Sequence, residues 1–346
     1  MVIKKITNKT TWEDFVLTQG YNSHFQSWNW GEFERSQGNK FENLGIYEGS
    51  KLIGLLPTKC VRARRGKYLQ LRHGPIFDFS DTKLLKYFVD FIYKKAKNEG
   101  FWFVRISPLI PIEDEEKYSN ELSGFKPCSL HNNDSELTWI LNITKGEDDI
   151  LANMRKNTRY YIRKAERDGV KIEKTKDLDK MEEFWQIYQN TVQRQKWAAY
   201  SREYITKEFQ SFLADDQIDL YLAKYNGKYI AASLILYYGK QAIYHHSGSL
   251  SAYSKIPASY LIQWEAIKES RNRGLKYYNF WGIAPIEKVG EEYEIEEGHP
   301  WEGLSFFKQG FGGGPRQFMH AKDLPVSPLY NLTRIFERVE KKSRGY

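Results

Sequence analysis

The chain contains the same order of predicted elements twice, and this internal repeat constrains its fold more than any other feature. Residues 45–107 and residues 220–282 each read as a strand, a tight turn, two more strands, an amphipathic helix that ends at a glycine, and a last strand. The turn glycine and the helix-closing glycine are 51 positions apart in the first copy and 47 positions apart in the second. Because the copies are well separated in the chain, this matched spacing indicates a duplicated domain and not a solenoid.

Length and composition leave room for two such domains and exclude several classes of protein. A chain of 346 residues can bury two separate cores. Its formal charge of +8 and its 16% aromatic residues suit an anionic partner such as phosphate, nucleotide or RNA, although such a charge can serve solubility alone. Cys60 and Cys128 are the only cysteines, which excludes a disulfide framework and a thiolate metal site. The sequence has no signal peptide and no membrane-spanning apolar run, so we expect a cytoplasmic protein and leave peripheral contact with the inner membrane face open.

The repeated unit predicts the fold class. A meander of strands, then a helix, then a strand resembles the GNAT acyltransferase fold, which positions an acyl donor and an amine with backbone amides and a few side chains. We therefore predict an α/β protein of two GNAT-like acyltransferase domains from an internal duplication, without a coiled-coil arm. The first covers residues 1–145 and is completed by 315–346, where an amphipathic helix ends the chain; the second covers 146–314. Neither copy has the glycine-rich pyrophosphate loop before its helix, which argues against acetyl-CoA as the donor.

A basic segment opens the second domain. Arg155, Arg159, Arg163 and Arg167 are each four residues apart on a predicted helix, so they form one slowly drifting cationic stripe. Because arginine is suited to bidentate contact with phosphate, we assign this stripe to the binding of a phosphate or another polyanion. The alternative is a solvated helix face without a ligand.

Two further patterns concern a possible metal site and a possible lid. His245 and His246 are adjacent on a predicted strand and should face opposite sides of a sheet, so they make a poor metal pair, and we predict no metal site. Residues 285–300 are rich in glutamate and read as an acidic loop that is either a lid or plainly solvated.

Four stretches carry a resemblance to a known family. They read QSWNWGEFERSQG near the start, RKNTRYYIRKAERDGV, PASYLIQWEAIKESRNRGLKYYNFWG, and GLSFFKQGFGGGPRQFMHAKDLPVSPLY near the end. Together they span most of the chain, and they resemble the Fem family (FemABX type). The resemblance implies a non-ribosomal peptidyltransferase that moves an amino acid from aminoacyl-tRNA to the stem-peptide amine of a peptidoglycan precursor, UDP-linked or lipid-linked. It implies no cofactor, since aminoacyl-tRNA is the co-substrate. It also implies that the arginine stripe at 155–167 meets tRNA or a diphosphate.

The resemblance also implies site residues. The family's Phe-Lys pair before the glycines falls on Phe307 and Lys308, where the lysine stabilises the charge that develops as the amine attacks the ester carbonyl. An Arg-x-Tyr feature after the second-half helices falls on Arg202 and Tyr204, and Tyr260 is a further aromatic candidate. The remaining candidate substrate contacts are Trp30, Arg35, Trp102 and Ser107.

The sequence also departs from the family pattern. Ser107 stands where the first-half strand often has an aspartate, and Asn279 stands where the second-half strand often has another. Because Ser107 cannot act as a carboxylate base, water or the ribose hydroxyl of the tRNA would remove the proton. These departures motivate a rival hypothesis, a catalytically silent binding protein on the same scaffold. A second rival is a GNAT-like N-acyltransferase that uses acyl-CoA or acyl carrier protein.

Overall fold

The chain folds into two compact units. The computed structural model describes residues 1–64, 66–129, 133–195, 199–290 and 292–344, with backbone only at 133 and 340–344. One unit is formed by Met1–Leu137 with Arg316–Tyr346, and the other by Thr138–Pro315. The boundary lies earlier than the predicted one after residue 145, because β8 (Leu137–Asn142) pairs with β13 (Tyr277–Gly282) of the second unit.

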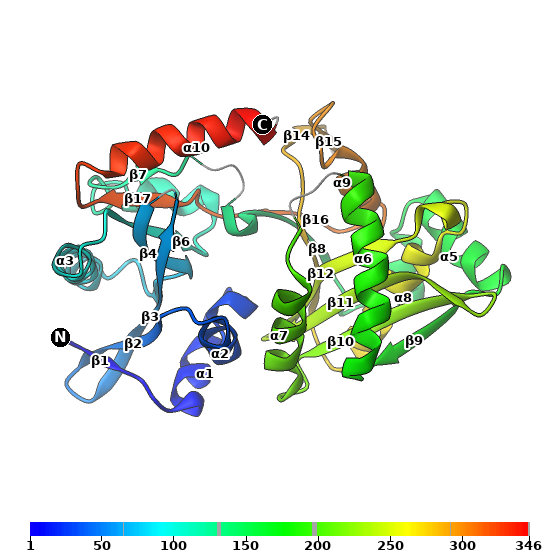
Figure 1. Cartoon of the computed structure of the whole chain (residues 1–346), viewed down its shortest axis with the longest axis horizontal. Coiled ribbons are helices and arrows are strands. Elements are labelled where there is room, and N and C mark those ends of the chain that lie inside the picture. The colour runs from blue at the N-terminus through cyan, green and yellow to red at the C-terminus, as the bar shows by residue number, and fades with distance from the viewer. Residues whose placement is uncertain (65, 130–132, 196–198, 291, 345–346) are drawn as a thin grey trace. The chain divides into compact units, whose positions relative to one another are not determined.

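The first unit is built on one mixed sheet (Figure 1). Along the sheet the order is β1 (Val2–Lys5), β2 (Phe41–Glu48), β3 (Lys51–Ala63), β4 (Gly66–His73), β6 (Phe103–Pro108), β17 (Lys322–Pro325) and β7 (Lys126–Pro127), and β5 (Ile76–Phe77) pairs with β3. The parallel pair β4 and β6 stays in register from Tyr68↔Phe103 to His73↔Pro108, so these two strands do not separate.

Helices cover this sheet because their apolar residues recur at helical spacing. α3 (Thr82–Asn98) starts at Asp81, whose carboxylate accepts the amides of residues 83 and 84, and its buried Leu84, Phe88 and Ile92 pack on the sheet. The remaining helices of the unit are α1 (Lys9–Leu17), α2 (Trp28–Ser36) and α10 (Tyr330–Arg344).

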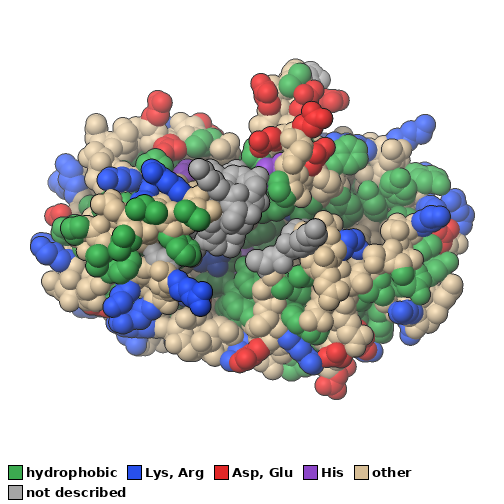
Figure 2. Space-filling view, turned by 45° about the horizontal axis from the view of Figure 1, so that its top comes forward, with side chains coloured by type: hydrophobic (Ala, Val, Ile, Leu, Met, Phe, Trp, Pro, Cys, Tyr) green, Lys and Arg blue, Asp and Glu red, His purple; other side chains and the backbone are tan. Residues whose placement is uncertain are grey.

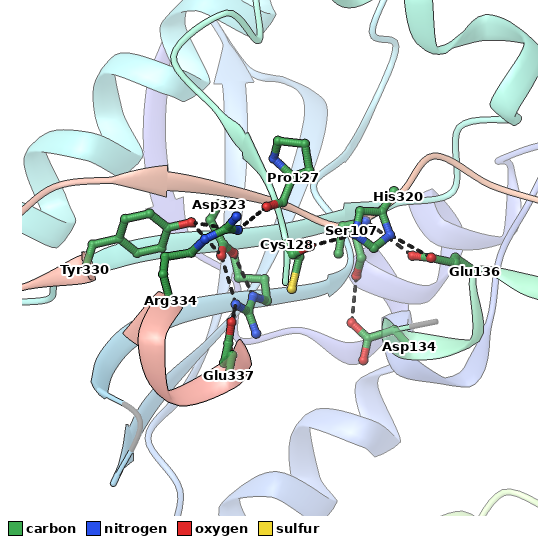
Figure 3. Close-up of polar contacts among 12 residues, drawn as sticks. Ser107, Pro127, Cys128, Asp134, Glu136, His320, Asp323, Tyr330, Arg334 and Glu337 are labelled. Carbon is green, nitrogen blue, oxygen red and sulfur yellow. Dashed lines mark hydrogen bonds and ion pairs between the residues drawn. The ribbon is translucent and has the colours of Figure 1, made fainter. Parts of the chain in front are cut away.

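A buried ion cluster fastens α10 to the sheet (Figure 3). The Arg105 guanidinium on β6 donates to Asp323 on β17 at 2.7 and 2.9 Å and to Glu337 on α10 at 2.9 and 3.1 Å. The Tyr330 hydroxyl donates to Asp323 as well. Breaking such a buried pair leaves an uncompensated charge, at a cost of about 3–5 kcal/mol, so the C-terminal helix is held firmly on this unit.

The second unit holds a seven-stranded sheet. Its order is β16 (Gly314–Gln317), β8, β13, β12 (Gln241–Ser249), β11 (Lys228–Tyr238), β10 (Ile218–Tyr225) and β9 (Lys171–Thr175). β10 and β11 are almost wholly buried, as expected of strands covered on both faces. They join at Asn226-Gly227, where both residues have positive φ (48° and 81°), the conformation that a two-residue hairpin turn needs.

Helices cover both faces of this sheet. α8 (Ala258–Asn272) packs on β10 and β11, and α5 (Lys156–Arg167) packs against α8. α6 (Met181–Gln195) and α7 (Arg202–Leu213) pack from the other side of the sheet (Figure 1). α4 (Glu147–Ala152) and α9 (Glu302–Gln309) complete the helices of this unit. The segment predicted as an acidic loop instead forms a hairpin of β14 (Ile286–Val289) and β15 (Glu292–Ile295), which projects as an acidic protrusion (Figure 2).

Candidate active site

Two neighbouring strands of the second unit separate at their ends. β12 and β13 are parallel and in register only from Gln241↔Tyr277 to Ile243↔Asn279, although β12 continues to Ser249. Beyond Ile243, the β12 edge that faces β13 therefore has no registered partner among the described strands. Backbone groups along such an unpaired strand edge can form hydrogen bonds with a ligand. The equivalent strands of the first unit stay paired, so of these two described parallel pairs the one in the second unit opens.

The end of β13 is held in an unusual backbone conformation. Trp281 has a φ of 67°, and the register with β8 shifts between Asn279 and Gly282. Positive φ is rare for a bulky residue and is found where the surroundings enforce it. Here the Asn279 side-chain oxygen accepts the Trp281 amide at 2.8 Å, and its amide nitrogen donates to Gln241 at 3.0 Å. The bulge directs the Gly282 carbonyl toward α9.

Lys308 on α9 meets that carbonyl. Its side chain is 4% exposed, and Nζ donates to the Gly282 oxygen. Burial lowers the pKa of Lys308 to about 7, and no carboxylate of the described residues pairs with this lysine. An ammonium that is desolvated and close to an open strand end is a strong electrostatic stabiliser of an oxyanion. The predicted role of Lys308 is therefore compatible with its surroundings.

The glycine run after α9 positions this lysine. A Cβ atom on Gly313 would lie 2.3 Å from the Ile140 carbonyl oxygen, and one on Gly310 would lie 2.4 Å from the Thr158 hydroxyl. The Trp139 indole also donates to the Gly312 carbonyl at 2.7 Å. The run is glycine because backbone passes directly over β8 and α5, and this close approach sets the position of α9.

Aromatic rings form one wall beside Lys308. Tyr260 on α8 packs edge-on against Phe307, with ring centroids 4.8 Å apart, and against Tyr161 at 4.9 Å. Burial raises the pKa of Tyr260, so its hydroxyl is a neutral hydrogen-bonding group at neutral pH. The structure thus brings together two predicted residues, Tyr260 and Phe307, and Phe307 directly precedes Lys308 in the chain.

The prediction that His245 and His246 face opposite sides of the sheet is wrong. β12 has a bulge at this point: Leu234 pairs with His246 and Ile235 with Tyr244, so His245 has no residue opposite it. Both rings therefore reach the same carboxylate, that of Glu208 on α7, with Nε2 atoms 2.8 Å (His245) and 2.9 Å (His246) from its oxygens. Burial alone would raise the pKa of Glu208, but the two imidazoles hold it well below its ordinary value.

The predicted cationic stripe is divided in two by its contacts. Arg155 donates to the Phe306 carbonyl and the Gln309 side chain, and Arg159 donates to backbone carbonyls of residues 151, 152 and 154 at the end of α4. The side chains of these two arginines therefore bond α9 and the end of α4 to α5. Arg163 and Arg167 are exposed and are the members available to a phosphate.

Arg202 and Tyr204, the other candidate contacts predicted in this unit, interact with residues of α6 and of the segment before α7. Arg202 forms a surface ion pair with Glu182 at 2.6 Å. The Tyr204 ring stacks on Tyr200 with centroids 4.5 Å apart, and Tyr200 in turn meets the His246 ring edge-on. Tyr204 is thus linked to the histidine pair, whereas Arg202 is occupied on the surface.

Three residues of the first unit that were predicted to contact substrate have structural roles instead. Trp30 is 1% exposed and packs among aromatic rings of the core, so it does not contact a substrate. Arg35 is bonded to Glu32 and to the Asn43 side chain. Trp102 packs against the cluster that seats α10. Their aromatic or cationic character gave no means of telling binding from packing.

Ser107 belongs to a buried polar cluster that the sequence did not reveal (Figure 3). Its hydroxyl donates to Asp134 at 2.8 Å, and the Arg72 guanidinium donates to the same carboxylate at 2.6 Å. Asp134 therefore supplies a carboxylate beside the position where the sequence has serine. Burial would raise the pKa of Asp134, but Arg72 and His73 lower it. A carboxylate paired in this way is a weak base, so its role is positioning.

Comparisons with known proteins agree with this arrangement. The model of the FemAB family matches residues 7–229 and 226–338. The chain is 23% identical to the UDP-N-acetylmuramoylpentapeptide-lysine N(6)-alanyltransferase of Weissella viridescens over 292 residues, which cover 79% of this chain and 83% of that protein. It is 21% identical to the aminoacyltransferase FemA of Staphylococcus epidermidis over a 426-residue alignment that covers 97% of this chain and all of that one.

Solved structures agree on the fold. A crystal structure of FemX has a TM-score of 0.81 at 16% identity and covers 96% of this chain and 99% of that one. A tandem GNAT protein from the clavulanic acid pathway has a TM-score of 0.53 at 7% identity and covers 84% of each chain. The predicted family and the predicted pair of GNAT-like domains are confirmed. Within the described residues, every helix is too short or too polar to cross a bilayer.

Proposed function

Because the chain belongs to the FemAB family, we propose that it transfers an aminoacyl group from an activated ester to an amine of a muramyl-peptide precursor of peptidoglycan. The names of its relatives support this reaction class and this type of acceptor. The observation that carries the proposal is the buried ammonium of Lys308 at the separated ends of β12 and β13. That is where an acyl carbonyl needs a cation as it becomes an oxyanion.

The reaction is an aminolysis. The nitrogen of the acceptor attacks the carbonyl carbon of the ester, a C–N bond forms, and the carbonyl oxygen becomes an oxyanion opposite Lys308. The C–O bond of the ester then breaks, and the leaving alcohol takes up a proton while the amine loses one. An ester already carries the free energy that the amide bond requires, so the reaction as proposed uses two substrates and no resident cofactor.

We propose aminoacyl-tRNA as the donor. The exposed Arg163 and Arg167 on α5 offer a phosphate-binding surface in the same unit as Lys308. The helix that follows β12 begins at Ala258 after Ile256-Pro257, without the glycine-rich loop that would hold a pyrophosphate. This favours tRNA over acyl-CoA, which stays the alternative donor.

The test is a direct assay of transfer. The purified protein is incubated with a mixed pool of charged tRNAs and UDP-linked muramyl pentapeptide, then with the lipid-linked precursor, and the acceptor mass is followed. We expect a gain of one amino acid with wild type and a loss of turnover in Lys308→Met. No gain with either acceptor would overturn the proposal, and binding of CoA by calorimetry would then favour the acyl-CoA alternative.

A lipid-linked acceptor would bring the protein to a membrane surface, and the α10 surface supports such a contact. We define it as the exposed apolar side chains on this helix and just before it: Leu329, Leu332, Ile335, Phe336 and Val339, each 43% to 65% exposed. At 100° per residue they lie on the side of the helix away from the buried Tyr330, Thr333 and Glu337.

Basic residues border this surface. Arg334 and Arg338 lie along one flank of the helix, and Figure 2 shows hydrophobic and basic side chains interspersed over this part of the first unit. An apolar stripe beside cationic residues fits an anionic lipid surface, where both features contribute to binding. We therefore propose that α10 rests on anionic lipid.

Vesicle flotation tests this contact. Leu332→Glu should reduce binding to phosphatidylglycerol vesicles, whereas Asn331→Glu adds the same charge at the neighbouring exposed position and should reduce it far less. Equal binding by both variants would overturn the membrane contact. If Leu332→Glu instead converts a dimer to a monomer in light scattering without lipid, a second copy of the chain covers this surface.

A further inference from the structure

One face of α5 combines exposed cations with an exposed aromatic ring. We define the α5 face by four side chains that recur at intervals of four, three and four residues: Lys156, Tyr160, Arg163 and Arg167. At 100° per residue they lie within about 60° of one another, on the side of the helix opposite its buried residues. All four are exposed, Tyr160 to 51%. This face is therefore open to a ligand over its whole length.

The cations of the α5 face are available to an anion. Among the described residues, no carboxylate forms an ion pair with Lys156, Arg163 or Arg167, whereas the neighbouring Lys164 is paired with Asp168. The acidic residue of α5 itself, at position 166, lies at least about 60° away around the helix. The face therefore presents positive charge only, which is complementary to a polyanion.

Tyr160 is the first of four aromatic rings in contact, which we call the aromatic row. Its ring lies edge-on to that of Tyr161, with centroids 5.5 Å apart. The Tyr161 ring contacts Tyr260 on α8 at 4.9 Å, and the Tyr260 ring contacts Phe307 on α9 at 4.8 Å. The three rings after Tyr160 are each partly exposed. The aromatic row thus runs from the α5 face to α9, the helix that carries Lys308.

We propose that the α5 face and the aromatic row bind the single-stranded 3′ end of the donor tRNA. Single-stranded nucleic acid is bound by basic side chains that follow its phosphates together with aromatic side chains on which successive bases stack. The α5 face supplies the cations and the aromatic row supplies the rings. In a duplex the bases are already stacked on one another, so a row of rings favours a single-stranded segment.

This assignment rests on the proposed function, which makes an aminoacyl-tRNA the donor. The ester of such a donor is on the ribose at the 3′ end of the strand. A strand whose bases follow the aromatic row is led from α5 to the helix that carries Lys308. An anionic lipid surface fits the α5 face less well, because the face has one tyrosine and no aliphatic side chain to insert.

Binding of uncharged RNA to the full-length protein tests the surface without any need for transfer. The probes are two fluorescein-labelled RNA hairpins with the same stem, one with a short single-stranded 3′ end and one blunt. Tyr160→Ala should weaken binding of the single-stranded end by about 10-fold and leave binding of the blunt hairpin unchanged. Tyr160→Phe keeps the ring and should bind as wild type does. Tyr93→Ala removes an exposed tyrosine from α3 and is the matched control, with no effect expected on either probe.

The salt dependence of binding separates the phosphate contacts from the base contacts. Lys156→Gln should lower the slope of log K against log salt concentration by about 0.7–0.9, as expected for the loss of one phosphate contact. Tyr160→Ala should lower the affinity and leave that slope unchanged, because it removes no charge. With 4-thiouridine in the single-stranded end, irradiation should attach the RNA to peptides from α5, α8 or α9.

The outcomes separate this surface from the proposed function. If Tyr160→Ala weakens both probes equally or neither, or if crosslinks form only outside these three helices, the assignment is overturned. A loss of binding to phosphatidylglycerol vesicles with unchanged RNA binding would overturn it as well and assign the α5 face to a membrane. If wild type transfers an amino acid while Tyr160→Ala binds RNA normally, the proposed function stands and this surface falls. If RNA binds as expected and wild type transfers no amino acid, the RNA site stands and the proposed function falls.

Discussion

Replacing Lys308 with methionine should stabilise the protein at low pH while it abolishes efficient catalysis. The pKa of Lys308 is about 7 against 10.5 for an ordinary lysine, and each pH unit corresponds to about 1.36 kcal/mol. Below pH 7 the buried ammonium therefore costs the folded state about 5 kcal/mol. Methionine keeps the length of the side chain and removes the charge, but it leaves the Gly282 carbonyl without its donor, a loss of about 1–3 kcal/mol.

The sign of the pH dependence follows from the lowered pKa. Between pH 7 and 10.5 the unfolded chain binds a proton at Lys308 that the folded chain has lost, so wild-type stability rises across this window. Lys308→Met should therefore exceed wild type by about 2–4 kcal/mol near pH 6 and fall below it by about 1–3 kcal/mol near pH 10.5.

Urea denaturation followed by tryptophan fluorescence at several pH values measures this difference. Lys288→Met, an exposed lysine on β14, is the control and should show no pH-dependent gain. In the transfer assay Lys308→Met should lose about 10²–10³-fold in kcat, and wild-type kcat/KM should decline as the pH rises through about 7. If the stability difference between Lys308→Met and wild type stays constant from pH 6 to 10.5, the conclusion that the Lys308 ammonium is desolvated is refuted.

Three further predictions follow from particular contacts. Gly313→Ala should destabilise the protein by about 2–4 kcal/mol, because the φ of Gly313 is 88° and the new Cβ would lie 2.3 Å from a carbonyl oxygen. Gly303→Ala in α9, where the glycine has open space around it, should instead stabilise the protein by about 0.5–1 kcal/mol. Urea denaturation of both variants measures the two effects. Arg163→Glu with Arg167→Glu should weaken tRNA binding and flatten its salt dependence, and unchanged binding across salt in filter-binding assays would remove that surface from the proposal. Asp134→Asn should lower the melting temperature at neutral pH, and the melting temperatures of variant and wild type should converge below pH 3.8. The lowered pKa of Asp134 gives a stabilisation that is lost as the carboxylate takes up a proton. A difference in melting temperature that persists in acid would contradict this.

Sequence patterns predicted the parts of this protein that depend on local physics. Period-two and helical spacing in the repeat identified the strands and helices of both units, and glycine at the turns marked where positive φ is needed. The glycine run after Lys308 indicated close backbone approach. Because these signals lie within a few residues of one another, a single sequence carries them.

The sequence could not place contacts that depend on pairing between distant segments. His245 and His246 were expected on opposite faces, yet one extra residue in β12 turns both toward Glu208, and that bulge depends on the register with β11. Arg155 and Arg159 have the same spacing as Arg163 and Arg167, but Arg155 contacts Gln309, 154 positions away, and Arg159 contacts the end of the preceding helix, α4. Asp134 reaches Ser107 from 27 residues away.

The sequence by itself determined the duplicated architecture, the family and the pairing of Phe307 with Lys308, because periodicity, turn chemistry and short motifs are local. Only the tertiary structure decided that the parallel strands separate in the second unit and stay paired in the first, that Lys308 is desolvated, and that two histidines share the Glu208 carboxylate. Desolvation and strand register depend on many contacts between residues far apart in the chain, so no short stretch of sequence predicts them.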